Sequence, residues 1–151
     1  MPGSVRRGGR VVRLRPVPKR PPTLSDLDPL LAELHRRVPE LQGVWLFGSL
    51  ARGSVRADSD IDLALLAREP LDVVRVFDLG LDLGVIASRD VDLVDLRRVS
   101  VLLRHIVCAE GRLLVAVDAA ACDAFVATTA AMHRAVREEQ RFVRAEVRGR
   151  S

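Results

Sequence analysis

The stretch LFGSLARGSVRADSDIDL, residues 46–63, indicates the fold class of this chain. An apolar run that begins at Gly43 ends at Gly48, and ten residues separate the following Ser49 from an Asp-Ile-Asp sequence that opens a second apolar run. A short apolar run bounded by glycines is typical of a buried strand, and the second run predicts another. We expect a short helix over Ser49–Arg52 that ends at Gly53, and a polar loop over 54–59 before the second strand.

The Asp-Ile-Asp sequence indicates a metal site. Because side chains alternate across a strand, Asp60 and Asp62 are expected on one face and Ile61 in the core. Two carboxylates held side by side repel each other, and a protein that keeps both usually neutralises them with a cation. Carboxylate oxygens favour Mg²⁺ or Mn²⁺. An isolated Asp-x-Asp is often only a surface feature, so this interpretation depends on the glycine and serine that precede it.

Gly48 and Ser49 predict a matching phosphate site. A glycine lets the backbone turn close to a ligand. A helix that starts there points its free N–H groups outward, and this arrangement binds phosphate. The Ser49 hydroxyl adds one more donor. Metal ions on Asp60 and Asp62 would bridge the same phosphates, which is the pattern of phosphoryl and nucleotidyl transfer.

A two-metal site of this kind commonly has a third carboxylate on a neighbouring strand. The sequence RDVDLVDL, residues 89–96, offers Asp90, Asp92 and Asp95. Asp92 is expected in the middle of a strand, where an unpaired charge would be costly to bury. It also lies on the opposite face from Asp95. We choose Asp92 as the third carboxylate and keep Asp90 as the second candidate.

Hydrophobic periodicity predicts the rest of the domain. In chain order we expect a helix at 23–38, strands at 43–48 and 60–66, a helix at 71–87, a strand at 91–96, a helix at 100–110, a strand at 113–117 and a long amphipathic helix at 118–148. This order predicts a single α/β domain over residues 23–150. Its sheet would have about four strands, flanked by helices.

The first 20 residues hold seven basic residues and no acid, although the whole chain has a net charge of only +4. We expect residues 1–22, rich in Arg, Pro and Gly, to form a disordered tail and to offer the chain's one potential contact with nucleic acid. No apolar run reaches the length of a membrane helix. The tail also lacks the apolar core of a secretory signal. We therefore expect a cytoplasmic protein without membrane contact.

Arginines recur every three or four residues along the last predicted helix. They are Arg134, Arg137, Arg141, Arg144 and Arg148. Such a stripe is either a solvated helix face or a docking surface for an acidic partner or for phosphates. The sequence leaves both interpretations open.

The quoted motif resembles the signature of the DNA polymerase beta-like nucleotidyltransferase superfamily. The fuller text FGSLARGSVRADSDIDLALL resembles its minimal nucleotidyltransferase branch, and the later VDLVDL resembles the strand that carries the third carboxylate. The resemblance implies a fold like the palm of polymerase beta, with a mixed sheet. It also implies ATP as donor, two Mg²⁺ ions, and transfer of a nucleoside monophosphate with release of pyrophosphate.

The resemblance also implies roles for individual residues. Asp60, Asp62 and Asp92 would bind the metal ions, and Gly48 and Ser49 would bind the triphosphate. A sixth residue, Arg52, would contact phosphate or order the loop that follows.

Many stand-alone members of this branch are antitoxins that adenylylate a tyrosine of a HEPN-type ribonuclease toxin, encoded beside them. The resemblance therefore implies a HEPN-type toxin as protein partner. This chain contains no tyrosine, which excludes modification of its own tyrosines. Two alternatives remain. One is transfer to a small molecule such as an aminoglycoside, although such enzymes usually carry an additional helical domain. The other is a non-catalytic antitoxin that acts by binding alone.

Overall fold

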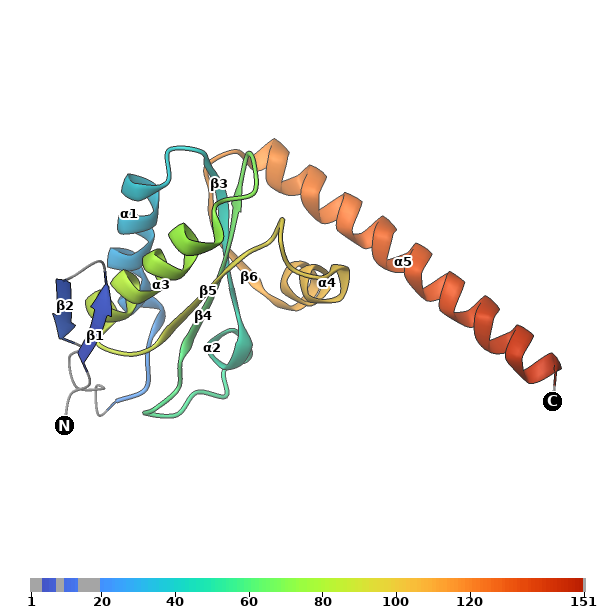
Figure 1. The fold of residues 1–151 in the computed structure, drawn as a ribbon, viewed down its shortest axis with the longest axis horizontal. Helices are drawn as coiled ribbons and strands as arrows, with labels where there is room; N and C mark the ends of the chain where they lie inside the picture. Colours follow the sequence, from blue (N-terminus) through green and yellow to red (C-terminus); the bar gives the residue numbers. More distant parts are fainter. Residues whose placement is uncertain (1–3, 8–9, 14–19, 151) are drawn as a thin grey trace.

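The computed structural model describes residues 4–7, 10–13 and 20–150 (Figure 1). From residue 23 onward its elements follow the predicted order. They are η1 (Leu24–Leu27, a 3-10 helix), α1 (Asp28–Arg37), β3 (Leu41–Phe47), α2 (Gly48–Arg52), β4 (Ile61–Ala67), α3 (Val73–Ala87), β5 (Val91–Asp95), α4 (Val101–Glu110), β6 (Arg112–Ala116) and α5 (Ala119–Gly149). Among the helices described, none is long and apolar enough to cross a membrane.

The central sheet has the strand order β5-β4-β3-β6. β3 pairs antiparallel with both β4 and β6. β4 and β5 are parallel, and α3 connects them. A parallel pair requires a long crossover of this kind, whereas antiparallel neighbours need only a short turn. The mixed four-stranded sheet, its flanking helices and the long C-terminal helix confirm the predicted fold class.

Helices cover both faces of the sheet, with α1 and α3 on one face and α4 and α5 on the other (Figure 1). Side chains of alternate β4 residues point into the two cores, one on each face of the sheet. Leu63 and Leu65 belong to the core that includes residues of α1 and α3. Ala64 and Leu66 belong to the core that includes residues of α4 and α5. Asp62 is two residues before Ala64 on the same strand, so its side chain also points to the α4–α5 face of the sheet.

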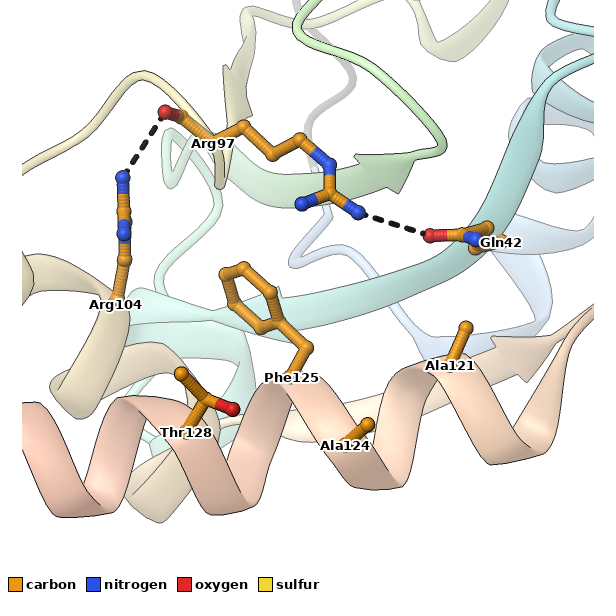
Figure 2. A pocket seen from close by; sticks show the side chains of 7 residues that line it. All are labelled: Gln42, Arg97, Arg104, Ala121, Ala124, Phe125 and Thr128. Atoms are coloured by element: carbon orange, nitrogen blue, oxygen red, sulfur yellow. Dashed lines mark hydrogen bonds between the residues drawn. The ribbon is translucent and has the colours of Figure 1, made fainter.

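The first half of α5 is anchored to the start of β3. The thiol Sγ of Cys122 on α5 lies 3.3 Å from the backbone oxygen of Gln42. Figure 2 shows Phe125 of α5 next to Arg97 and Arg104, whose guanidinium carbons lie 5.8 and 6.0 Å from the ring centroid. Arg97 in turn donates a hydrogen bond of 3.2 Å to the Gln42 side chain. These contacts pack one face of the N-terminal part of the helix against the sheet.

Gly43, which was predicted to begin a strand, lies inside that strand. The sequence pattern begins this strand at Gly43, whereas β3 begins at Leu41 and contains Gly43. A Cβ atom at Gly43 would lie 2.5 Å from the Sγ of Cys122 and 3.2 Å from the backbone oxygen of Val115. The glycine therefore allows α5 to pack closely on the sheet, and it does not mark the end of the strand.

The N-terminal segment differs in part from the expected disordered tail. β1 (Ser4–Arg7) and β2 (Arg10–Arg13) form an antiparallel two-stranded sheet. Valine and arginine make up most of both strands, and the β-branched valines favour extended structure. Residues 1–3, 8–9 and 14–19 lie outside the described residues, so the expected limit of the tail near residue 22 stays a prediction.

Candidate active site

Carboxylates predicted to bind metal meet on two neighbouring strands. Asp62 of β4 and Asp92 of β5 are register partners in the parallel pair. In a parallel pair, register partners point to the same face of the sheet. Both side chains therefore lie on the α4–α5 face. Asp60 directly precedes β4, because this strand begins at Ile61, one residue later than predicted.

The environment of Asp92 corrects one expectation. Its side chain is exposed, so the cost of burying a charge does not apply to it. β5 is an edge strand of the sheet, and Asp92 reaches water there. Asp90 precedes β5 and is exposed as well. Asp95 is buried on the other face and accepts backbone N–H hydrogen bonds of 2.8 and 2.9 Å, which gives it a structural role.

Gly48 lies directly against the carboxylate of Asp62. Its backbone has φ of +72°, in the left-handed region that favours glycine. A Cβ atom built at Gly48 would overlap Oδ2 of Asp62 and lie 2.8 Å from its Cγ. The glycine of the motif thus lets the turn after β3 approach the acid of β4, so the two halves of the predicted site are in contact.

α2 begins at this turn and carries the other two predicted residues, Ser49 and Arg52. The first N–H groups of a helix have no intrahelical partners, and no side-chain hydrogen bond caps the start of α2. The helix ends at Gly53, which has φ of +73° and was predicted to end it. Arg52 lines a narrow crevice together with Gly48, Ile106 and Glu110. The turn thus presents backbone donors and a cation beside the acids.

Burial and mutual repulsion raise the pKa values of two site carboxyls. Burial is the largest cause for Asp62, whose pKa rises to about 6. The charges of Asp92 and Asp60 raise it further, and Arg52 opposes them. The pKa of Asp60 is also raised, first by burial and then by the charges of Asp90 and Asp92. Without a bound cation, this cluster therefore holds negative charge at an energetic cost.

This set of donors fits a divalent cation. Carboxylate oxygens are hard ligands that Mg²⁺ prefers, and a cation would relieve the repulsion around Asp62. In the described part of the chain, no three Asp, Glu, His or Cys side chains are placed to hold a metal ion as they stand. Mg²⁺ usually keeps water ligands and takes phosphate oxygens from its substrate. The geometry therefore fits an ion that binds together with a phosphate ligand.

Sequence reasoning missed Arg89, which supports the loop before Asp60. Its side chain is only 6% exposed. It donates hydrogen bonds of 3.0 Å to the backbone oxygen of Ser59 and 2.7 Å to that of Arg20. The sequence signal that was available is the position of this arginine, directly before the acids of the RDVD sequence. Arg89 holds the backbone next to Asp60 and joins it to the N-terminal side of the domain.

A known protein family matches more than half of this chain. The model of the family described as "Polymerase beta, Nucleotidyltransferase" matches residues 30–120, which include all six predicted site residues. The chain belongs to this family. The family and the enzyme class predicted from the sequence, nucleotidyltransferase, are thereby confirmed.

Similar proteins of the family come from toxin–antitoxin systems. The protein adenylyltransferase MntA of Shewanella oneidensis is 41% identical over 81 residues, which cover 54% of this chain and 58% of that protein. A crystal structure of a toxin–antitoxin with AMP-PNP superposes with a TM-score of 0.71 at 32% identity, covering 78% of this chain and 94% of that one. The match to MntA thus spans little more than half of that protein's length.

A second similar structure contains an AMPylated protein. It is described as the tri-AMPylated Shewanella oneidensis HEPN toxin in complex with MNT antitoxin. It superposes on this chain with a TM-score of 0.68 at 29% identity and covers 82% of this chain and 96% of that one.

Proposed function

We propose that this chain is a protein adenylyltransferase that uses ATP and Mg²⁺ to modify and neutralise a HEPN-type ribonuclease toxin in the cytoplasm. The observation that carries the proposal is the contact of Gly48 with Asp62 beside Asp92, because it joins a turn with free backbone N–H groups to a pair of acids. The likeness to the protein adenylyltransferase MntA and to the complex with the tri-AMPylated toxin supports the protein acceptor.

In this proposal the acceptor hydroxyl oxygen attacks the α-phosphorus of ATP. A new P–O bond forms, the bond to the pyrophosphate breaks, and the hydroxyl proton leaves to solvent. Asp60, Asp62 and Asp92 would hold Mg²⁺, which neutralises phosphate charge and favours the deprotonated acceptor. The free N–H groups at Gly48 and Ser49 would bind the triphosphate. Arg52 would offset the negative charge of phosphate or acid near that turn.

These roles explain why carboxylates that repel each other lie close together in this protein. The repulsion that raises the pKa of Asp62 to about 6 is a cost in the metal-free protein. It becomes binding energy once a cation occupies the acids, because the same charges then attract it. Catalysis of nucleotidyl transfer depends mainly on such positioning and charge neutralisation.

The test is transfer to the product of the adjacent gene, which the proposal expects to be a HEPN-type toxin. The purified chain is incubated with that protein, ATP and Mg²⁺, and the masses of both proteins are measured. We expect the partner to gain one or more adenylyl groups, carried on tyrosine. Because this chain has no tyrosine, tyrosine-linked AMP identifies the partner as acceptor. No mass gain on the partner would overturn the proposal.

Matched variants separate catalysis from binding. Asp62→Asn keeps the size of the side chain and removes its charge, so we expect loss of transfer. Asp58→Asn removes a neighbouring exposed acid that was not assigned to the metal, so we expect transfer to continue. If Asp62→Asn still neutralises the toxin fully in cells, neutralisation is by binding alone and the catalytic proposal is wrong.

A further inference from the structure

The second half of α5 projects away from the rest of the fold (Figure 1). Every residue from Arg134 to Arg150 is exposed, whereas Cys122 and Thr129 earlier in the helix are buried. Isolated helices of this length are only marginally stable in water. The projecting segment therefore has the length and exposure of an element that is stabilised by a partner.

The exposed segment continues the apolar stripe of the packed half. Met132, Val136, Val143 and Val147 recur at helical spacing after the buried Thr129. Val143 is 50% exposed and Val147 is 64% exposed. On the packed half the same stripe buries itself against the sheet, but on the projecting half it has no covering in the described structure. An exposed apolar stripe of this kind marks a contact surface for another protein.

A basic groove lies beside this stripe, between α4 and α5. The rings of His105 on α4 and His133 on α5 stack with centroids 3.6 Å apart. The groove has a volume of about 370 Å³, and Arg134, Arg137 and Arg141 line it together with the two histidines and Glu138. Burial, His105 and Arg137 lower the pKa of His133. Positive charge is therefore crowded here, with a single carboxylate among the lining residues.

The charge of the projecting segment determines the kind of partner. Residues 134–150 contain six arginines and three glutamates. None of Arg134, Arg137 and Arg141 takes part in the ion pairs found among the described residues. Two copies of such a helix would repel each other along their basic edges, which disfavours a second copy of this chain. An acidic protein surface with apolar side chains complements both the groove and the stripe.

The groove is connected to the candidate active site by α4. Leu102 and Ile106 are 60% and 36% exposed and lie one helical turn apart on that helix. Ile106 also lines the crevice that contains Gly48 and Arg52. Asp62 and Asp92 lie on the same face of the sheet as α4 and α5. A protein bound along α4 and the projecting half of α5 would therefore extend to the catalytic acids.

We propose that the α4–α5 groove and the projecting half of α5 form the docking surface for the acceptor protein, which contributes a surface with acidic and apolar side chains. The identity of the acceptor rests on the proposed function. The basic stripe seen in the sequence is then a recognition element. It acts away from the metal-binding acids and selects the protein that is modified.

The test measures the affinity of the adjacent HEPN-type protein by calorimetry, without ATP. The first variant is Arg134→Glu/Arg137→Glu/Arg141→Glu, and its matched control is Arg134→Lys/Arg137→Lys/Arg141→Lys. Glu and Lys are both good helix formers and all three positions are exposed, so α5 should stay folded in both variants. We expect the glutamate variant to bind on the order of tenfold or more weakly and the lysine variant to bind nearly as wild type does. Wild-type affinity should also fall with added salt.

AMP-PNP affinity should be the same in all three proteins, because these arginines are not part of the nucleotide site. The docking proposal is overturned if the glutamate variant binds the partner as wild type does, or if wild type does not bind it. It is also overturned if the variant loses only self-association or only RNA binding. If wild type binds the partner through these arginines but transfers no AMP to it, docking is supported and the proposed function fails.

Discussion

Asp62 and Asp92 are register partners on parallel strands, although 29 residues separate them in the sequence. The crossover through α3 brings the second acid beside the first. Gly48, at the end of the antiparallel neighbour β3, then contacts Asp62 from the other side. Three strands thus contribute to one cluster.

Replacement of the third carboxylate distinguishes the two candidates on β5. We expect Asp92→Ala to abolish transfer, because Asp92 is the register partner of Asp62. We expect Asp90→Ala to retain most activity, since Asp90 lies before the strand. Transfer of AMP at saturating Mg²⁺ measures both. The reverse result would assign the third carboxylate to Asp90.

The raised pKa of Asp62 predicts a gain in stability when its charge is removed. The folded pKa is about 6, whereas an unfolded aspartate titrates near 3.9. Between these values the folded state binds more protons, so stability falls as pH rises from about 4 to about 6. In a buffer with a metal chelator, Asp62→Asn should therefore melt at a higher temperature than wild type at pH 7.5. We expect the free energy of unfolding of the two proteins to differ by roughly 1–3 kcal/mol.

That advantage should shrink as the pH is lowered to 4, where Asp62 of the wild type is itself neutral. A scan of melting temperature against pH for both proteins measures it. An Asn variant that is less stable than wild type at pH 7.5 would show that Asp62 is not under electrostatic strain.

Alanine variants of two glycines distinguish the cost of backbone strain from the cost of steric overlap. Gly48 and Gly53 have φ of +72° and +73°, but a Cβ atom at Gly53 has no heavy atom within 4 Å. Gly53→Ala should therefore cost only the left-handed conformation, about 1 kcal/mol. Gly48→Ala should cost more and should displace Asp62. A displacement of this kind lowers the transfer rate on the order of 100-fold.

Chemical denaturation and the rate of AMP transfer measure the two alanine variants. Equal losses of stability and activity in both would show that the contact between Gly48 and Asp62 does not matter.

Arg89 is expected to act on the site through the backbone before Asp60. Arg89→Met removes its hydrogen bonds to the oxygens of Ser59 and Arg20, which costs about 1–3 kcal/mol when the carbonyls are left unpaired. The loosened loop should raise the Mg²⁺ concentration required for half-maximal transfer. Arg56→Met, in the same loop but exposed, is the control and should change neither quantity. An unchanged Mg²⁺ requirement in Arg89→Met would limit Arg89 to a structural role.

Local patterns in the sequence were sufficient for most elements of this fold. Alternating or continuous apolar runs predicted the strands of the central sheet, and Gly53 ended α2 where predicted, because these features depend on side chains a few residues apart. The motif also identified the acids and the turn before the structure placed them in contact. The strands Ser4–Arg7 and Arg10–Arg13 were not predicted, since their valines favour extended structure where the composition favoured disorder.

Long-range packing decided the rest. The pairing of β4 with β5 determines that Asp92 is beside Asp62, and the edge position of β5 leaves Asp92 exposed, although a mid-strand position predicted burial. Gly43 lies inside β3 because α5 packs against it. The exposure of α5 beyond Arg134 likewise depends on where the sheet ends. These features depend on the register in which strands pair and on the surface area that distant elements bury against each other. A local pattern of residue types specifies neither.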